Sequence, residues 1–313
     1  MKGLELSRRY YEAFGKEMLE NDFGEILPYL AIGLSGSGSE CYGFDDEKSQ
    51  DHDFEPSFCI FLPENDVVDE KTAFRLERAY AKLPKSFMVF DRCPVSPVGG
   101  SRHGVIRMDD FFLSKVGSKD GYLSLEQWFS VPEYGLLEAT NGAIFNDNYG
   151  QFTLIREKLR YFPEDVFRKK LAGHLLLMNQ SGQYNYGRCI SRGETGAAQM
   201  SVFEFAKSAL NCIYLLNRTY MPYYKWCFRG LDGLSRLKEL KDKLEYIISS
   251  GNTPDEVNKK TDIIEYICSS VADEARLQGV AVTNGSDLEK IAHCVNNMIS
   301  DNNIRNANIL SGV

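Results

Sequence analysis

The sequence lacks the paired cysteines and histidines from which disulfide frameworks and zinc sites are built. Its eight cysteines are scattered without a Cys-x-x-Cys pair, and its four histidines lie far apart. Most of the cysteines stand among apolar neighbours, which is typical of reduced, buried thiols. A zinc site needs several such ligands at short spacing. These shortages argue against a disulfide-rich secreted protein and against a zinc site.

Long apolar runs and an excess of basic residues are also missing. No stretch reaches the roughly 18 consecutive apolar residues that span a membrane. The first residues, MKGLELSRRYYEAFG, mix charge into every turn, unlike a secretory signal. Lysine and arginine number 36 against 44 acidic residues, a formal net charge of −8, whereas general binders of phosphate backbones carry clustered basic residues. We expect a cytoplasmic protein with no membrane segment and, at most, a local basic groove.

Apolar patterning in the first half of the chain predicts an α/β layer. The 313 residues are 43% hydrophobic and 26% charged, an ordinary globular composition whose length suggests about two domains. The pattern predicts a helix at 4–22, strands at 28–36 and 52–62, a helix at 66–82, and strands at 86–90 and 103–112. Strands that alternate with helices in this way indicate a layered sheet.

The second half of the chain has helical periodicity. Apolar residues recur at helical spacing in 164–180, 182–192, 194–219, 231–250, 254–274 and 286–300. Pro163 stands where a helix would begin. The predicted fold class is therefore α+β: an N-terminal α/β domain with a mixed sheet at 1–150, then a C-terminal helical bundle at 151–313. Because no low-complexity linker separates them, we expect closely packed domains with a cleft between them.

The turn Gly36-Ser37-Gly38-Ser39 follows a predicted buried strand and precedes a predicted helix start. Glycines let the backbone approach a phosphate closely, and the turn amides and serine hydroxyls can donate hydrogen bonds to its oxygens. A turn that merely connects two elements is the alternative interpretation.

Two aspartates, Asp51 and Asp53, open the second predicted strand with His52 between them. Residues two apart on a strand point to the same face, so the carboxylates would repel one another unless a cation lay between them. Mg²⁺ suits such a site, because it takes carboxylate and phosphate oxygens and keeps several waters; Mn²⁺ is the alternative ion. A solvated acidic strand end would explain the pair without a metal.

The spacing of the two features resembles a known signature. Gly38-Ser39, eleven residues, and then Asp51-His52-Asp53-Phe54 are similar to the hydrophobic-Gly-Ser turn and paired carboxylates of the polymerase-β-type nucleotidyltransferase superfamily. His52 departs from the pattern, which has an apolar residue between the acids. Gly36-Ser37 fits the spacing less well, so Ser37 is kept as a secondary phosphate contact.

A longer set of segments narrows the resemblance. GLSGSGSECYGFDDEKSQDHDF (33–54), HGV (103–105), EATNGAIFND (138–147) and LLNRTYMPYYKW (215–226) resemble a bacterial family catalogued as a domain of unknown function. That family is similar to the aminoglycoside and lincosamide nucleotidyltransferases. The resemblance implies a nucleotide-binding α/β domain paired with a helical domain that binds the substrate, and it leaves the substrate open.

The resemblance also implies a third carboxylate, which completes a two-metal site or acts as the base for the attacking hydroxyl. Asp109 and Asp110 lie in the predicted strand at 103–112, where only one of them can face the metal. Glu204, in the helical half, is another candidate, since related enzymes draw a base from that domain. An exposed acid at the end of an element is the alternative for each.

Basic residues of the helical half are candidates for binding the triphosphate. Tyr184, Arg188 and Arg192 recur at helical spacing and would line one face; a solvated face is the alternative. Lys225 stands among aromatic residues in PYYKW, and the resemblance places a triphosphate-binding lysine in this region. Cation–π packing would also account for it.

Two functions follow as expectations. The first is an enzyme that moves a nucleoside monophosphate from a nucleoside triphosphate, by expectation ATP, to a hydroxyl of a small molecule, with Mg²⁺ held by Asp51 and Asp53. An RNA acceptor would use the same chemistry, and the acidic net charge argues against it. The second is a non-catalytic sensor that binds nucleotide on the same fold, which the uncertain third carboxylate favours. The sequence leaves the acceptor, the preferred base and the oligomeric state open.

Overall fold

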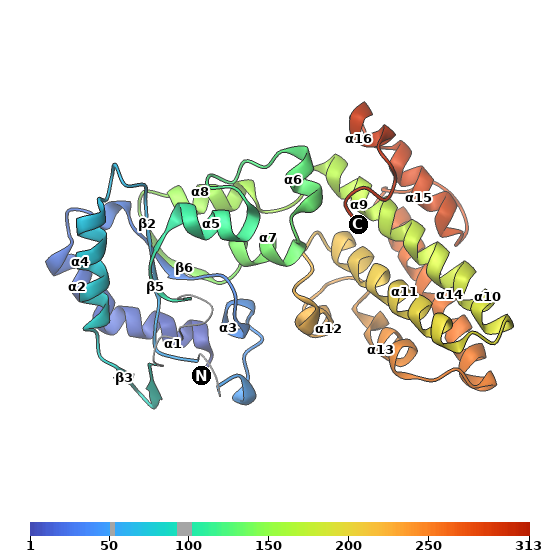
Figure 1. The fold of residues 1–313 in the computed structure, drawn as a ribbon, viewed down its shortest axis with the longest axis horizontal. Helices are drawn as coiled ribbons and strands as arrows, with labels where there is room; N and C mark the ends of the chain where they lie inside the picture. The colour runs from blue at the N-terminus through green and yellow to red at the C-terminus, as the bar shows by residue number, and fades with distance from the viewer. Residues whose placement is uncertain (51–53, 93–101) are drawn as a thin grey trace. The chain divides into compact units, whose positions relative to one another are not determined.

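The computed structural model describes residues 1–50, 54–92 and 102–313. Its fold is α+β, with a small mixed sheet in the first half of the chain and helices through the second (Figure 1). The chain divides into two compact units. The first unit comprises Met1–Leu123 and Tyr134–Arg160, and the second comprises Ser124–Glu133 and Tyr161–Val313.

The first unit is built on a four-stranded sheet with the order β5-β2-β1-β6. Its strands are β1 (Ala31–Leu34), β2 (Cys59–Leu62), β5 (Gly104–Arg107) and β6 (Ala143–Asp147). Strand β1 pairs antiparallel with both β2 and β6, whereas β2 and β5 are parallel. The mixed sheet predicted from the sequence is therefore confirmed. Every residue of β1 and β2 is buried, as expected for central strands covered on both faces.

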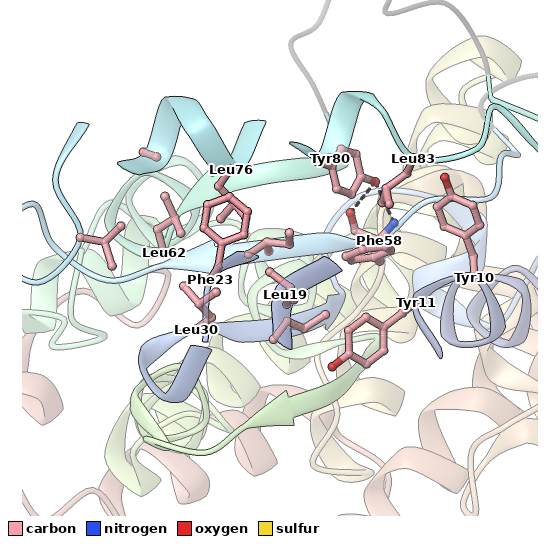
Figure 2. Packing of buried hydrophobic residues seen from close by; sticks show 14 residues of the cluster. Tyr10, Tyr11, Leu19, Phe23, Leu30, Phe58, Leu62, Leu76, Tyr80 and Leu83 are labelled. Carbon is pink, nitrogen blue, oxygen red and sulfur yellow. Dashed lines mark hydrogen bonds between the residues drawn. The ribbon is translucent and has the colours of Figure 1, made fainter. Parts of the chain in front are cut away.

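Helices cover both faces of this sheet. On one face, side chains of β1 and β2 join a cluster with residues from α1, α2 and α4, which includes Tyr10, Leu19 and Leu76 (Figure 2). On the other face, Phe61 of β2 packs against Phe111 of α5 and Phe152 of α8. The further elements in this part of the chain are α1 (Gly3–Tyr10), the π-helical η1 (Tyr11–Gly15), α2 (Lys16–Asp22), η2 (Leu27–Tyr29), α3 (Ser39–Tyr42), η3 (Glu47–Gln50), α4 (Glu70–Ala81), β3 (Ser86–Phe87), β4 (Phe90–Asp91), α5 (Met108–Val116), α7 (Glu133–Thr140) and α8 (Gln151–Lys158).

Three strand predictions need correction. In the described part of 52–62, residues 54–58 are not in a strand, and β2 begins only at Cys59. The strand predicted at 103–112 ends at Arg107, where α5 begins with two acids in its first turn, a placement that the helix dipole favours. Residues 86–90 form a hairpin rather than one strand, since Met88 has a φ of 56° between β3 and β4.

The second unit is helical, as the periodicity predicts. Helix α9 begins directly after Pro163 and packs against α11 and α15. The elements of the second unit are α6 (Leu125–Ser130), α9 (Glu164–Met178), the π-helical η4 (Asn179–Tyr186), α10 (Gly187–Ser191), α11 (Thr195–Leu216), η5 (Tyr224–Trp226), α12 (Cys227–Leu231), η6 (Lys238–Leu240), α13 (Lys241–Ser249), α14 (Pro254–Leu277), α15 (Leu288–Asn297) and α16 (Asn302–Asn306). No helix in the described part of the chain is long and apolar enough to cross a membrane.

Candidate functional site

The Gly-Ser turn lies at the edge of the sheet where β1 ends. Strand register places Gly33 opposite Cys59 and Leu34 opposite Ala143, and Cys59 in turn pairs with Gly104. The first residues of β2, β5 and β6 therefore meet beside the last residues of β1. Segments far apart in the sequence converge at this edge, which is where side chains could surround a ligand of the turn.

Two glycines give the turn its shape. Gly36 and Gly38 have φ angles of 118° and 123°, which side-chain-bearing residues rarely adopt. The Asn141 side chain holds the first of them: the Gly36 amide donates to its Oδ1 at 2.9 Å, and its Nδ2 donates to the Gly36 carbonyl at 2.9 Å. Asn141 lies just before β6, so the start of this strand holds the backbone of the turn.

A triangle of polar groups lies against the second residue of the turn. Lys115 Nζ donates to Ser37 Oγ at 2.8 Å and to Glu138 Oε2 at 2.6 Å, and Ser37 Oγ donates to the same carboxylate oxygen at 2.9 Å. The Tyr42 hydroxyl donates to Glu138 Oε1 at 3.0 Å. Burial, together with the Glu138 carboxylate, raises the pKa of Tyr42 and keeps this donor protonated.

The two serines of the turn differ in what they contact. The Ser37 hydroxyl is bonded to Lys115 and Glu138, whereas no hydrogen bond of the Ser39 hydroxyl is found in the described part of the chain. Of the two side chains, Ser39 therefore has the hydroxyl whose hydrogen-bonding capacity is not used within the described residues. Ser37 instead orients the lysine and the glutamate.

Buried carboxylates anchor the segment after the turn. Glu40 is buried with its carboxylate folded toward Gly38, and burial raises the pKa of Glu40. Asp45 accepts a hydrogen bond from the Gly3 amide at 2.9 Å and forms an ion pair with Lys2 at 3.5 Å. The chain that leads toward the paired aspartates is thus tied to the start of α1.

Asp51 and Asp53, the predicted metal ligands, lie outside the described residues. On their N-terminal side, Asp46 Oδ1 accepts hydrogen bonds from the backbone amides of Lys48 and Ser49 at 3.1 Å. On their C-terminal side, Phe54 is buried with its ring 5.1 Å from that of Phe90. Within 1–50, 54–92 and 102–313, no three His, Cys, Asp or Glu side chains are grouped as metal ligands.

The acids predicted to lie on the strand at 103–112 lie on a helix. Asp109 and Asp110 are in the first turn of α5, and Asp109 pairs with Lys119 at 3.6 Å. Strand β5 itself consists of glycine, valine, isoleucine and arginine, so it contributes no acid to the sheet edge. Helical spacing of Met108, Phe111 and Phe112, all buried, explains why the helix begins here.

The remaining candidates belong to the second unit, whereas the turn belongs to the first. Glu204 is exposed on α11, and Arg188 is exposed on α10. Arg188 donates to the Tyr184 hydroxyl and stacks 4.7 Å from the centre of that ring. Lys225 is exposed in η5, with Nζ 4.8 Å from the Trp226 ring, so it has the cation–π contact that was the alternative to a phosphate role.

Sequence reasoning did not identify Lys115, Glu138 or Asn141 as site residues. Lys115 lies in the last turn of α5, and 78 positions separate it from Ser37. Glu138 and Asn141 begin the segment 138–147, which served in the sequence only as part of the family resemblance. Its Asn-Gly pair before a short apolar run was the available signal, because it indicates a turn into a strand.

Comparison with known proteins adds one match. Residues 128–227 match a family model described as a domain of unknown function (DUF4037). The matched segment includes Glu138 and Asn141, whereas the Gly-Ser turn and Lys115 lie outside it. No curated protein matches the chain.

Proposed function

We propose that the protein is a nucleotidyltransferase of the polymerase-β type. In this proposal it transfers a nucleoside monophosphate from a nucleoside triphosphate, ATP, to a hydroxyl acceptor. The placement of the Gly-Ser turn carries the proposal. The turn follows β1, which is antiparallel to β2, and in the sequence Asp51 and Asp53 stand eight and six positions before Cys59, the first residue of β2. Triphosphate and carboxylates would therefore meet at one sheet edge.

The donor set suits a magnesium ion. Asp51 and Asp53 would hold it, because paired carboxylates together with phosphate oxygens are ligands that Mg²⁺ prefers. A magnesium ion held there would supply charge neutralisation as pyrophosphate leaves. The acceptor oxygen forms a bond to the α-phosphorus, the bond from this phosphorus to the β-phosphate bridging oxygen breaks, and the hydroxyl proton passes to a base. The Ser39 hydroxyl would hold the triphosphate in line for this attack.

The acceptor that we propose is a small molecule held by the helical unit. The chain has a formal net charge of −8, and clustered basic side chains are what drive binding to an RNA backbone. The protein is incubated with ATP labelled at the α-phosphate, in one series with small hydroxyl compounds and in a parallel series with RNA. The compound that receives the label distinguishes the two classes of acceptor. Transfer of label to RNA alone would contradict the small-molecule proposal.

A nucleotide sensor is the second candidate, and one observation favours it. Strand β5 runs beside β2 and has no carboxylate along its length, although a third acid on a neighbouring strand is what the resemblance implies. Release of pyrophosphate from labelled ATP separates the two functions. Tight binding without release, across a broad panel of acceptors, would support the sensor.

Removal of the two aspartates tests the site. We expect wild-type protein to bind ATP in a magnesium-dependent manner, and we expect Asp51→Asn/Asp53→Asn to abolish this binding, because amides are poor substitutes for anionic ligands. Isothermal titration calorimetry measures both. A matched control removes two exposed charges after β2, as Glu64→Gln/Asp66→Asn. If the Asp51/Asp53 variant binds magnesium-ATP as tightly as the wild type, the assignment is wrong.

A further inference from the structure

Lys115 is held in an environment that is unusual for a lysine. Its side chain is 19% exposed, and its Nζ lies between Ser37 and Glu138 at 2.8 and 2.6 Å. Its Cε would be 3.9 Å from a Cβ placed on Gly36. The aliphatic stem of the lysine therefore lies beside the start of the turn, and its ammonium group contacts the hydroxyl of the second turn residue, Ser37.

The hydrogen bonds of this ammonium group are incomplete. A lysine ammonium group has three N–H donors. In the described part of the chain, Lys115 uses two of them, one to Ser37 and one to Glu138. Two lysines without exposed surface in the second unit differ from it. Lys169 and Lys260 each donate to three oxygen acceptors. All three ammonium N–H groups of these two lysines are used within the protein, as suits a structural role. Lys115 keeps one N–H group that can donate to a ligand.

Glu138 is bound in a way that suits positioning. Its carboxylate receives donors from Lys115, Ser37 and Tyr42, so it remains anchored when a ligand contacts the lysine. Glu138 therefore holds Lys115 in place through the 2.6 Å contact with its ammonium group.

We propose that Lys115 binds the β- or γ-phosphate of the nucleoside triphosphate, and that Ser37 and Glu138 are positioning residues for it. The inference rests on the proposed function. The third N–H of the Lys115 ammonium group would donate to a phosphate oxygen beside the turn, and the positive charge would offset the charge that develops on the departing pyrophosphate. This assigns the triphosphate cation to the first unit, on the same sheet edge as the turn.

Comparison of nucleotides with different phosphate numbers tests the inference. Affinities for ATP, ADP and AMP, each with Mg²⁺, are measured by calorimetry or by displacement of a fluorescent nucleotide. We expect Lys115→Met to weaken the binding of ATP about 10- to 100-fold, the range for a hydrogen bond to a charged group. The affinity for AMP should be unchanged. Lys115→Arg keeps the charge and should recover part of the ATP affinity.

The matched control is Lys119→Met. The side chain of Lys119, which lies close to the end of the same helix, is 61% exposed, and we expect no change in any of the three affinities. A purely structural role for Lys115 would lower the affinities for ATP, ADP and AMP by the same factor, and that result would overturn the inference.

Two failures are distinguishable. If the wild-type protein binds no magnesium-ATP, the proposed function fails and this inference fails with it. If the wild type binds and Asp51→Asn/Asp53→Asn abolishes binding, but Lys115→Met binds ATP as tightly as the wild type, the inference is wrong while the proposed function stands.

Discussion

At the scale of single residues, His174 is the most perturbed histidine in the described part of the chain. It lies in α9, buried, and its Nδ1 has no hydrogen-bond partner there. Burial, together with the nearby charges of Lys170 and Lys207, lowers the pKa of His174 to about 3. The imidazole is therefore neutral in the folded protein across the physiological range.

This histidine makes the protein sensitive to acid. Because its folded pKa lies below the unfolded value of about 6.5, the unfolded chain binds the additional proton, and stability falls as the pH drops from about 6.5 toward 3. By pH 4.5 the loss from this group reaches about 2–3 kcal/mol. We expect His174→Gln, which cannot be protonated, to lose less stability than the wild type over this range.

Urea denaturation at pH 7 and pH 4.5 measures the effect as the difference in unfolding free energy between the two proteins. His293→Gln, at an exposed position of α15, is the control for the substitution itself. If the difference for His174→Gln is constant with pH, protonation of His174 does not limit acid stability.

At the scale of elements, the contact between β6 and β1 depends on a glycine. Gly142 precedes β6 with a φ of 70°, and a Cβ on it would be 2.0 Å from the carbonyl oxygen of Leu34. Gly150 precedes α8 with nearly the same φ, 74°, and a Cβ there would meet nothing within 4 Å. The two positions share a left-handed backbone, which would strain any residue with a side chain, and they differ in the steric contact that a Cβ would make.

The pair gives a matched prediction. We expect Gly150→Ala to cost about 1 kcal/mol of unfolding free energy, the strain of a left-handed residue. We expect Gly142→Ala to cost about 3 kcal/mol, because overpacking against the β1 carbonyl adds to that strain. Urea denaturation measures both. Equal costs would show that the backbone near Leu34 moves freely enough to accept a methyl group.

Elements with strong local patterns were predictable from the sequence. Strand β1 and helix α4 lie where apolar runs and helical spacing place them. The boundary between β5 and α5 was missed, because the sequence GVIRMDDFF has apolar residues whose spacing fits a strand as well as a helix. Strand β6 was missed because its five residues are only half-buried, which weakens the apolar signal.

The same distinction applies to the site. A Gly-Ser turn is a local feature, and its glycines have the positive φ angles that the turn requires. The contacts of Lys115 and Glu138 with Ser37 join residues 78 and 101 positions apart, and they follow from the strand order rather than from any local pattern. Sequence spacing could therefore predict the turn, but not the lysine and the glutamate that contact it.

At the scale of the whole molecule, the chain passes between the two compact units three times, after Leu123, Glu133 and Arg160. The boundary predicted at 150/151 separates β6 from α8, and α8 belongs to the first unit. This helix contributes Phe152, whose ring lies 4.3 Å from Phe61 and 4.8 Å from Phe112. It also contributes Arg156, which donates to the carbonyl of Asn141 at 2.7 Å. Core and site both depend on α8.

A pair of fragments tests this dependence. We expect 1–160 to unfold cooperatively and 1–150 to lack a cooperative transition, because loss of a buried phenylalanine alone costs about 3–5 kcal/mol, a large part of the stability of a domain. Thermal unfolding followed by circular dichroism compares them. Phe152→Ala in the full chain is the control for the packing contribution. If 1–150 unfolds as cooperatively as 1–160, the sheet does not need α8, and Asn141 must hold the Gly-Ser turn without support from Arg156.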